Sequence, residues 1–246
     1  MTSRLDKLLA ANGFGSRKDV KRLLHNRTLT VNGAISRDPS AIVNPERDRF
    51  TLDGENLVIR TSVYLMLNKP AGVITSTEDP DHTTVMDLLR EPWSKMDLFA
   101  VGRLDLDTEG LLLLTNDGPL GHALTSPKTG VDKTYFARLR DPVDAELFIE
   151  YENRFLSDIT FRDGYTCLPA KIYRDTPVMN EVFLTIQEGK YHQVKKMFKA
   201  VGNEVIYLKR ISMGTLVLDP NLDCGNYREL SAEEIYMLRH QMEEAK

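Results

Sequence analysis

The charge of this chain changes sign along its length, and that change divides it into two parts. Residues 1–60 carry 11 Lys and Arg against 7 Asp and Glu, whereas residues 61–246 carry 21 against 29, giving net charges of +4 and −8. A short basic segment ahead of a longer acidic one is typical of a phosphate-binding module, because Lys and Arg displace counterions condensed on nucleic acids. We therefore expect two domains, 1–60 and 61–246. The alternative for the first is a basic surface that only contacts solvent.

The composition excludes several classes of protein. With 246 residues, 41% of them hydrophobic, the chain can bury a core. Its longest uninterrupted apolar run is the five residues Val63–Leu67, whereas a membrane-spanning helix needs roughly 18. No apolar stretch follows the charged N-terminus, so we expect a cytoplasmic protein without a secretory signal. Cys167 and Cys224 fit no disulfide or metal spacing, and no metal site is expected.

Residues 1–60 have the pattern of a small α+β module. Apolar residues at positions 5, 8 and 9 predict a short helix that ends at Asn12-Gly13. Ser16 is the expected N-cap of a second helix, and residues 28–31 and 49–52 are expected strands. The second helix would present its cations on the face opposite its apolar residues, namely Lys18, Lys21 and Arg22.

The rest of the chain alternates between strand and helix patterns. The expected strands are 64–69, 110–115, 135–139, 182–186, 204–208 and 215–218. The expected helices are 85–89, 120–126, 145–151, 192–201 and one that starts at Ser231, where Glu234 completes a capping box. Residues 55–63 are the expected link between the parts. This order predicts an α+β fold with a mainly antiparallel sheet.

The densest cluster of charged residues lies in the segment 101–110. Arg103, Asp105, Asp107 and Glu109 stand between two glycines, directly before the apolar run Leu111–Leu114. An Arg two residues from an Asp can keep that carboxylate ionised and oriented, and loops on rigid scaffolds concentrate catalytic side chains. Composition alone favours a surface turn with its own salt bridge over a catalytic loop.

The basic segment resembles the alpha-L RNA-binding motif of a ribosomal small-subunit protein and of some tRNA synthetases. The resemblance rests on RLDKLLA from residue 4, SRKDVKRLL from residue 16 and LTVNG from residue 29. It implies RNA binding by this domain. The cations expected to contact RNA are Arg4, Lys7, Arg17, Lys18, Lys21 and Arg22.

The longer part resembles the RsuA-type branch of the pseudouridine synthases, which modifies ribosomal RNA. Residues 102–110 are similar to that family's signature loop, and segments 67–76, 133–135 and 188–198 resemble its other motifs in the expected order. The resemblance implies a pseudouridine synthase domain that needs no cofactor. It assigns the catalytic roles to Asp105, Tyr135 and Lys195. Relatives often have Arg at the last position, and a lysine would orient Asp105 less strictly because it lacks the bidentate fork.

The implied reaction breaks the N1–C1′ bond of a uridine, rotates the uracil and rejoins it through C5. Asp105 is expected to act on the ribose, either by attack on C1′ or by removal of the 2′ proton. Tyr135 is either the base that removes the C5 proton or a stacking group. Asp107 is the rival of Asp105, because residues two apart in an extended segment share a face.

A uridine in folded RNA must leave the stack to be modified, so further contacts to phosphate or base are expected. The candidates in this part are Lys69, Arg103, His192, Gln193, Lys196 and Arg210. The expected partner is ribosomal RNA in a partly assembled small subunit, bound by a monomer. The alternatives are the same reaction on large-subunit RNA, a non-catalytic ribosome-assembly factor and a glycoside hydrolase that uses Asp105.

Overall fold

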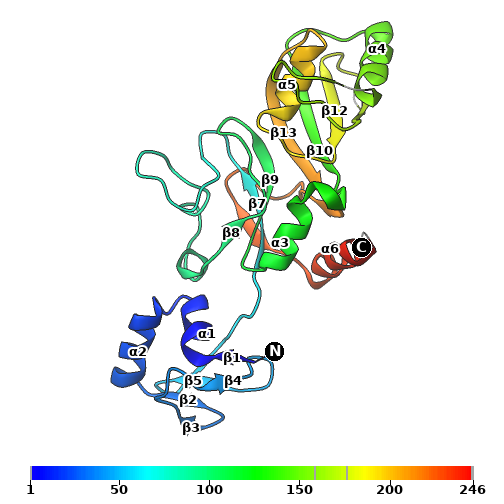
Figure 1. Cartoon of the computed structure of the whole chain (residues 1–246). Helices are drawn as coiled ribbons and strands as arrows, with labels where there is room; N and C mark the ends of the chain where they lie inside the picture. The colour runs from blue at the N-terminus through cyan, green and yellow to red at the C-terminus, as the bar shows by residue number, and fades with distance from the viewer. Residues whose placement is uncertain (1, 158, 176, 245–246) are drawn as a thin grey trace. The chain divides into compact units, whose positions relative to one another are not determined.

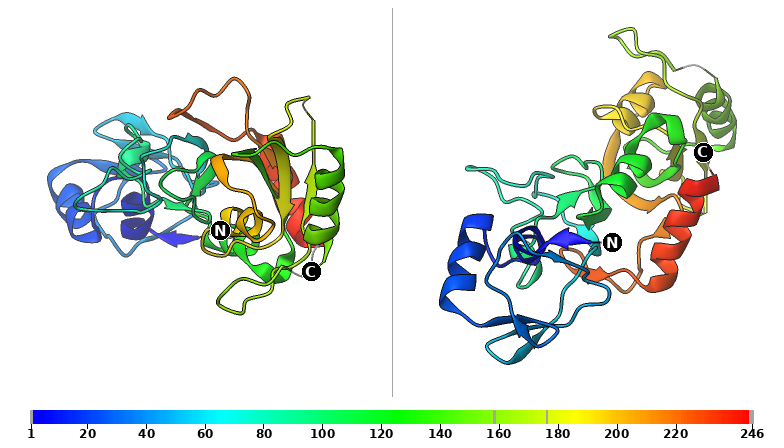
Figure 2. Two further views of the ribbon diagram at one scale, coloured as in Figure 1. Left: turned by 90° about the horizontal axis from the view of Figure 1, so that it is seen from above. Right: turned by 60° about the horizontal axis from the view of Figure 1, so that its bottom comes forward.

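The computed structural model describes residues 2–157, 159–175 and 177–244. The chain forms two compact units (Figures 1 and 2). The first contains the described residues up to Val63 together with Leu89–Phe99, and the second contains Tyr64–Leu88 and the described residues from Ala100 onward. The sequence patterns indicated a division near residue 60 but not the return of Leu89–Phe99 to the first unit.

The first unit begins with two helices, α1 (Leu5–Ala11) and α2 (Arg17–Asn26), both predicted. Ser16 caps α2 as expected: its hydroxyl accepts from the amide of Asp19, whose carboxylate accepts from the amide of Ser16 at 2.9 Å. This reciprocal pair satisfies amide groups that have no partner inside the helix. It therefore fixes where α2 starts and which of its faces is apolar.

The strands of the first unit are short and antiparallel. They pair in the order β3 (Ala34–Ile35), β2 (Leu29–Val31), β5 (Phe50–Leu52) and β6 (Glu55–Leu57), and β1 (Ser3–Arg4) pairs with β4 (Ile42–Val43). A 3₁₀ turn, Trp93–Lys95, belongs to the same unit. Apolar side chains from both helices and the sheet form the core: Leu5, Leu8, Leu9, Val20, Leu24, Leu29, Val43, Phe50 and Leu52. Residues 55–57 therefore extend this sheet and are not part of a link.

The second unit is built on one mixed sheet, as predicted. Its strands follow the order β11 (Lys171–Tyr173), β12 (Glu181–Ile186), β10 (Lys133–Leu139), β13 (Val205–Met213), β9 (Glu109–Thr115), β7 (Tyr64–Lys69) and β15 (Tyr227–Glu229). β8 (Phe99–Ala100) pairs with β9, and β14 (Leu216–Val217) pairs with β13. The pairing is antiparallel except between β13 and β9, which run parallel (Figure 1).

Helices pack against both halves of this sheet. α4 (Ala145–Leu156) and α5 (Gln193–Ala200) meet through the rings of Tyr151, Phe155 and Phe198, whose centroids lie 5.2 to 6.3 Å apart. α3 (Gly118–Thr125) contacts α6 (Ala232–Glu244), and a 3₁₀ turn, Pro127–Thr129, follows α3. None of the helices formed by described residues has the length and hydropathy that a membrane crossing requires.

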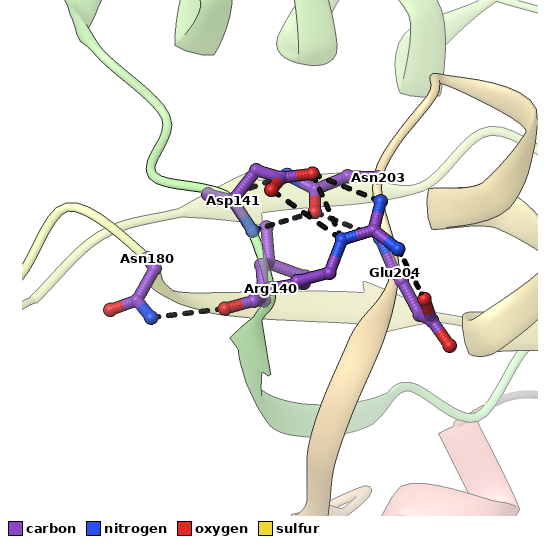
Figure 3. A network of polar contacts seen from close by, with 6 residues as sticks. Arg140, Asp141, Asn180, Asn203 and Glu204 are labelled. Carbon is purple, nitrogen blue, oxygen red and sulfur yellow. Dashed lines mark hydrogen bonds and ion pairs between the residues drawn. The ribbon is translucent and has the colours of Figure 1, made fainter.

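A polar network joins the end of β10 to the start of β13 (Figure 3). Arg140 Nη1 donates to Glu204 Oε2 at 2.5 Å, and Asn203 exchanges hydrogen bonds of 3.1 and 3.2 Å with the main chain of Asp141. Asn180 Nδ2 donates to the main-chain oxygen of Leu139 at 3.0 Å. These bonds fix the register of the central strands of the sheet.

One expected helix is absent. Residues 85–89 form turns, although Thr84 and Asp87 exchange the reciprocal bonds that often begin a helix: Asp87 accepts from the amide of Thr84 at 2.8 Å, and the hydroxyl of Thr84 accepts from the amide of Asp87 at 3.3 Å. Glu91-Pro92 follows soon after and cannot continue a helix. The other expected helices and strands occur, with ends that shift by a few residues.

Candidate active site

A buried lysine forms hydrogen bonds to the main chain of the loop that carries Asp105. Lys69, the last residue of β7, is 0% exposed, and its amine donates to the main-chain oxygens of Asp105 at 3.1 Å and Thr108 at 3.0 Å. Burial lowers the pKa of Lys69 from its ordinary value to about 8. The expectation that Lys69 contacts RNA is wrong, because a fully buried amine that binds carbonyl groups cannot reach a phosphate. Its role is to fix the loop.

The segment after Lys69 holds the same loop at two further points. The hydroxyl of Thr75 donates to the oxygen of Leu104 at 2.9 Å and accepts from its amide at 3.1 Å. The amide of Gly72 donates to the oxygen of Leu106 at 2.8 Å. The motif at residues 67–76 therefore positions the main chain on both sides of Asp105. The sequence analysis did not identify Thr75, because a lone threonine gives no pattern.

Gly110 allows the two halves of the sheet to join beside the loop. It has a φ of +99°, and a Cβ there would meet Lys209 Cγ and the amide of Arg210 at 2.9 Å. Arg210 is 2% exposed and donates from Nε to the oxygen of Leu111 at 2.7 Å. Arg210 thus supports β9 from within the protein, and its burial leaves it almost no exposed surface for the RNA contact that was expected. Its Nη2 is also buried and has no hydrogen-bond partner among the described residues.

A lysine and a histidine from the other half of the sheet face the carboxylates of the loop. Lys195, on α5, places its amine 3.4 Å from Asp105 Oδ2 and 2.5 Å from Asp107 Oδ1. His192, directly before α5, has Nε2 3.5 Å from Asp105 Oδ1. The hydrogen bond from Lys195 lowers the pKa of Asp107 below its usual value. The structure thus brings Asp105 and Lys195 together from segments 90 residues apart in sequence.

The surroundings of the two carboxylates differ. The side chain of Asp105 is 27% exposed, whereas that of Asp107 is 71% exposed. Asp105 lines a pocket of about 60 Å³ together with Tyr135, Arg103 and Lys195, and Asp107 does not line it. Tyr135, on β10, is buried. The pocket therefore unites the three expected catalytic residues and excludes the rival aspartate.

A second, larger pocket of about 490 Å³ adjoins the first at Arg103 and Asp105. Six residues line both pockets: Arg103, Leu104, Asp105, Gly189, Lys190 and His192. Arg103 is exposed between them. A nucleotide that entered the larger pocket would therefore lie next to Arg103, Asp105 and His192 together. The structure thus places Arg103 and His192 beside the site, where the sequence analysis expected RNA contacts.

Gln193, which was expected to contact phosphate or base, is buried and bonded to the protein. It is 3% exposed, its amide nitrogen donates to Glu188 Oε1 at 2.7 Å, and its amide oxygen accepts from the amide of Lys190 at 2.9 Å. Glu188 is itself buried and also accepts from the amide of Leu168 at 3.0 Å. These bonds fix the turn that carries His192 to the site. Gln193 therefore shapes this turn, and it also lines the small pocket beside Asp105.

The cations expected to bind RNA in the first unit lie on its surface: Arg4, Lys7, Arg17, Lys18, Lys21 and Arg22. Arg4 pairs with Asp6 at 2.8 Å, and Arg22 pairs with Asp19 on α2. Lys18 and Lys21 are exposed on that helix, opposite the buried Val20 and Leu24. Across the described residues of both units, no group of three or more His, Cys, Asp or Glu side chains has the arrangement of a metal site.

Comparison with known proteins matches both parts of the chain. A model of the RNA pseudouridylate synthase family matches residues 63–200, and a model of the S4 domain matches residues 3–48. Over 237 residues the chain is 47% identical to an uncharacterized RNA pseudouridine synthase of Bacillus subtilis (strain 168), covering 96% of this chain and 98% of the relative. It is 43% identical over 241 residues to the ribosomal small subunit pseudouridine synthase A of Escherichia coli (strain K12), covering 94% and 98%. A crystal structure of a pseudouridylate synthase superposes with a TM-score of 0.66 at 38% identity, covering 96% and 99%.

Proposed function

The chain belongs to the RNA pseudouridine synthase family and carries an N-terminal S4 domain, and on this premise we propose that it modifies a uridine of small-subunit ribosomal RNA with Asp105 as the catalytic group. As a member of that family it is an isomerase. The pocket shared by Asp105, Tyr135 and Lys195 is the observation that supports the choice of residue. The relative from Escherichia coli, named for the small subunit, supports the choice of RNA.

The position of Asp105 supports its proposed role. The reaction breaks the N1–C1′ bond and forms a C5–C1′ bond, and the C5 proton is lost while N1 gains one, so no atom or electron is added. A carboxylate beside the ribose serves either attack on C1′ or removal of the 2′ proton. Lys195 and His192 hold the two oxygens of Asp105 at 3.4 and 3.5 Å. The charged amine of Lys195 and the ring of His192 thus flank the carboxylate on both sides and orient it.

Tyr135 and Arg103 have complementary places around the pocket. Tyr135 is buried in the pocket wall, where its ring can stack on the uracil and its hydroxyl can reach the base once C5 replaces N1. Arg103 stands exposed at the mouth shared with the larger pocket. We assign to Arg103 the space that the flipped uridine leaves in the RNA stack.

The RNA would be held by both units. The exposed cations of α2, Arg17 among them, and Lys7 of α1 supply charge for phosphate groups in the S4 domain. The proposed substrate is a partly assembled small subunit, bound by a monomer in the cytoplasm. Turnover on naked small-subunit RNA and on isolated assembly particles would distinguish the two forms of substrate.

Pseudouridine mapping of ribosomal RNA tests the function directly. RNA from cells that lack the gene should lose pseudouridine at one small-subunit position, and wild-type protein should restore it while Asp105→Asn should not. Asp107→Asn, two residues away and paired with the same lysine, is the matched control and should restore it. If pseudouridine were lost at a large-subunit position instead, the proposed reaction would stand and the proposed substrate would change. If no position changed, a non-catalytic RNA-binding factor would replace this proposal.

A further inference from the structure

A basic groove lies next to the active site on the far side of α5. It has a volume of about 610 Å³ and is bounded by α5, the end of α4 and the segment 160–163. The charged and aromatic residues that line it are Arg154, Arg162, Lys196, Lys199, Asp163 and Phe161. None of the sequence motifs includes Arg154, Arg162 or Phe161, and the catalytic pocket uses none of them.

The charge of this groove is opposite to that of its surroundings. Residues 61–246 have a net charge of −8, yet the groove contains four cations and one carboxylate. Arg154, Arg162 and Lys199 are exposed, and none of them forms an ion pair with another described residue. The carboxylate of Asp163 lies 3.9 Å from Lys196 and leaves the other three cations available. Such a concentration of positive charge on an acidic body attracts a polyanion.

Helix α5 connects the groove to the active site. Lys195 points to Asp105, and the next residue, Lys196, places its amine 5.3 Å from the ring centre of Phe161 and 5.4 Å from that of Tyr191. Tyr191 is 73% exposed and stacks on His192 with ring centres 3.8 Å apart. Since Tyr191 and His192 line the larger pocket, the groove begins where that pocket ends.

We propose that this groove binds the phosphate backbone of the single-stranded RNA that flanks the target uridine, with Tyr191 as a stacking surface between groove and pocket. The proposal rests on the proposed function, because it assumes that the substrate is RNA. A row of cations next to an exposed aromatic ring fits single-stranded nucleic acid: the cations follow the backbone, and a base of any kind can stack on Tyr191. An acidic protein would use the charge but would not need an exposed ring leading to a pocket.

The test compares two double variants with the same loss of charge. Arg162→Gln with Lys199→Gln removes two groove cations, and Lys128→Gln with Lys171→Gln removes two exposed lysines of the same unit that line neither the groove nor the two pockets. The first measurement is binding of an oligouridylate of about 12 nucleotides, a length suited to single-stranded sites. This probe reports on the groove without requiring turnover.

We expect the groove variant to bind the oligouridylate about tenfold more weakly. The slope of log K against log salt concentration should be shallower by about 1.4, because each of the two lost phosphate contacts contributes about 0.7 to that slope. On a ribosomal RNA fragment its KM should rise about tenfold while the single-turnover rate at saturation stays within about twofold, because no reacting group has changed. The control variant should match wild type in both assays.

Equal binding by the groove variant and wild type would overturn the proposal and leave an acidic protein as the partner to consider. Equal losses in both variants would also overturn it, because the effect would then come from overall charge. Failure of the proposed function has a different signature: wild-type protein would form no pseudouridine in ribosomal RNA, whatever the oligouridylate binding showed.

Discussion

The amine of Lys69 donates to the main-chain oxygen of Asp105 across 3.1 Å. Lys69 ends β7, and Asp105 lies in the loop before β9, so one buried side chain sets the position of the loop relative to the sheet. Because the bond is to the main chain, it can hold Asp105 in place without neutralising its carboxylate. Lys195 and His192 are then left to orient the side chain.

Substitution of Lys69 should therefore lower the catalytic rate and leave RNA affinity nearly unchanged, because Lys69 does not contact the substrate. We expect Lys69→Met to lower kcat about 100-fold, because displacement of a catalytic group by about 1 Å has an effect of that size. RNA affinity should stay within about threefold of wild type, since the buried amine contacts no phosphate. Single-turnover kinetics and filter binding check the two parts. A variant with normal kcat would show that the loop does not need this anchor.

The same lysine should make stability depend on pH. Burial lowers the pKa of Lys69 from 10.5 to about 8, so between these values the unfolded chain holds a proton that the folded chain has lost. The free energy of unfolding rises with pH where the unfolded state binds more protons. Between pH 7.5 and pH 9.5, the free energy of unfolding of wild type, measured with urea, should rise relative to that of Lys69→Met. A constant difference, or one of opposite sign, would contradict the effect of burial.

Gly110 should tolerate no side chain. We expect Gly110→Ala to lower the free energy of unfolding by about 3 kcal/mol, because a Cβ would press on the main chain of Arg210 in the neighbouring strand. Gly225→Ala is the matched control: its φ is also positive, at +84°, but nothing lies within 4 Å of its Cβ position. It should lose only about 1 kcal/mol from backbone strain. If urea unfolding showed the same loss of free energy of unfolding in both variants, the close approach of Gly110 to the main chain of Arg210 would not be the cause.

The cations of α2 should act on affinity alone. Lys18→Gln with Lys21→Gln should weaken RNA binding about tenfold and make its salt dependence shallower, because two phosphate contacts would be lost. The rate at saturating RNA should not change. Arg47→Gln with Arg49→Gln removes two exposed cations elsewhere in the same unit and should bind like wild type. If the two pairs lost the same affinity, α2 would not be a specific docking face.

Most of the local structure was predictable, because it depends on neighbouring residues. Ser16 with Asp19 and Ser231 with Glu234 form the reciprocal caps that their spacing predicts. Alternating and β-branched residues predicted the main strands of the sheet. The family resemblance then supplied the candidate catalytic residues, and the structure places Asp105, Tyr135 and Lys195 around one pocket.

Long-range packing could not be read from the sequence. Lys69, Gln193 and Arg210 were assigned to RNA because such side chains are usually exposed, yet each is buried and donates at least one hydrogen bond to the protein. The parallel join of β9 and β13 unites residues about 100 positions apart in sequence, a pairing that periodicity does not reveal. Only the three-dimensional arrangement separates a cation that supports the loop from one that faces solvent.

The most direct test of the account is the single-turnover rate of Asp105→Asn on a ribosomal RNA fragment that contains the mapped uridine, with Asp107→Asn measured beside it. Both substitutions keep the size of the side chain and remove one charge next to Lys195. The account predicts at least about a 10⁴-fold loss for Asp105→Asn and less than about a tenfold loss for Asp107→Asn, with RNA binding unchanged in both. Pseudouridine formation by Asp105→Asn near the wild-type rate, or an inactive Asp107→Asn, would contradict it.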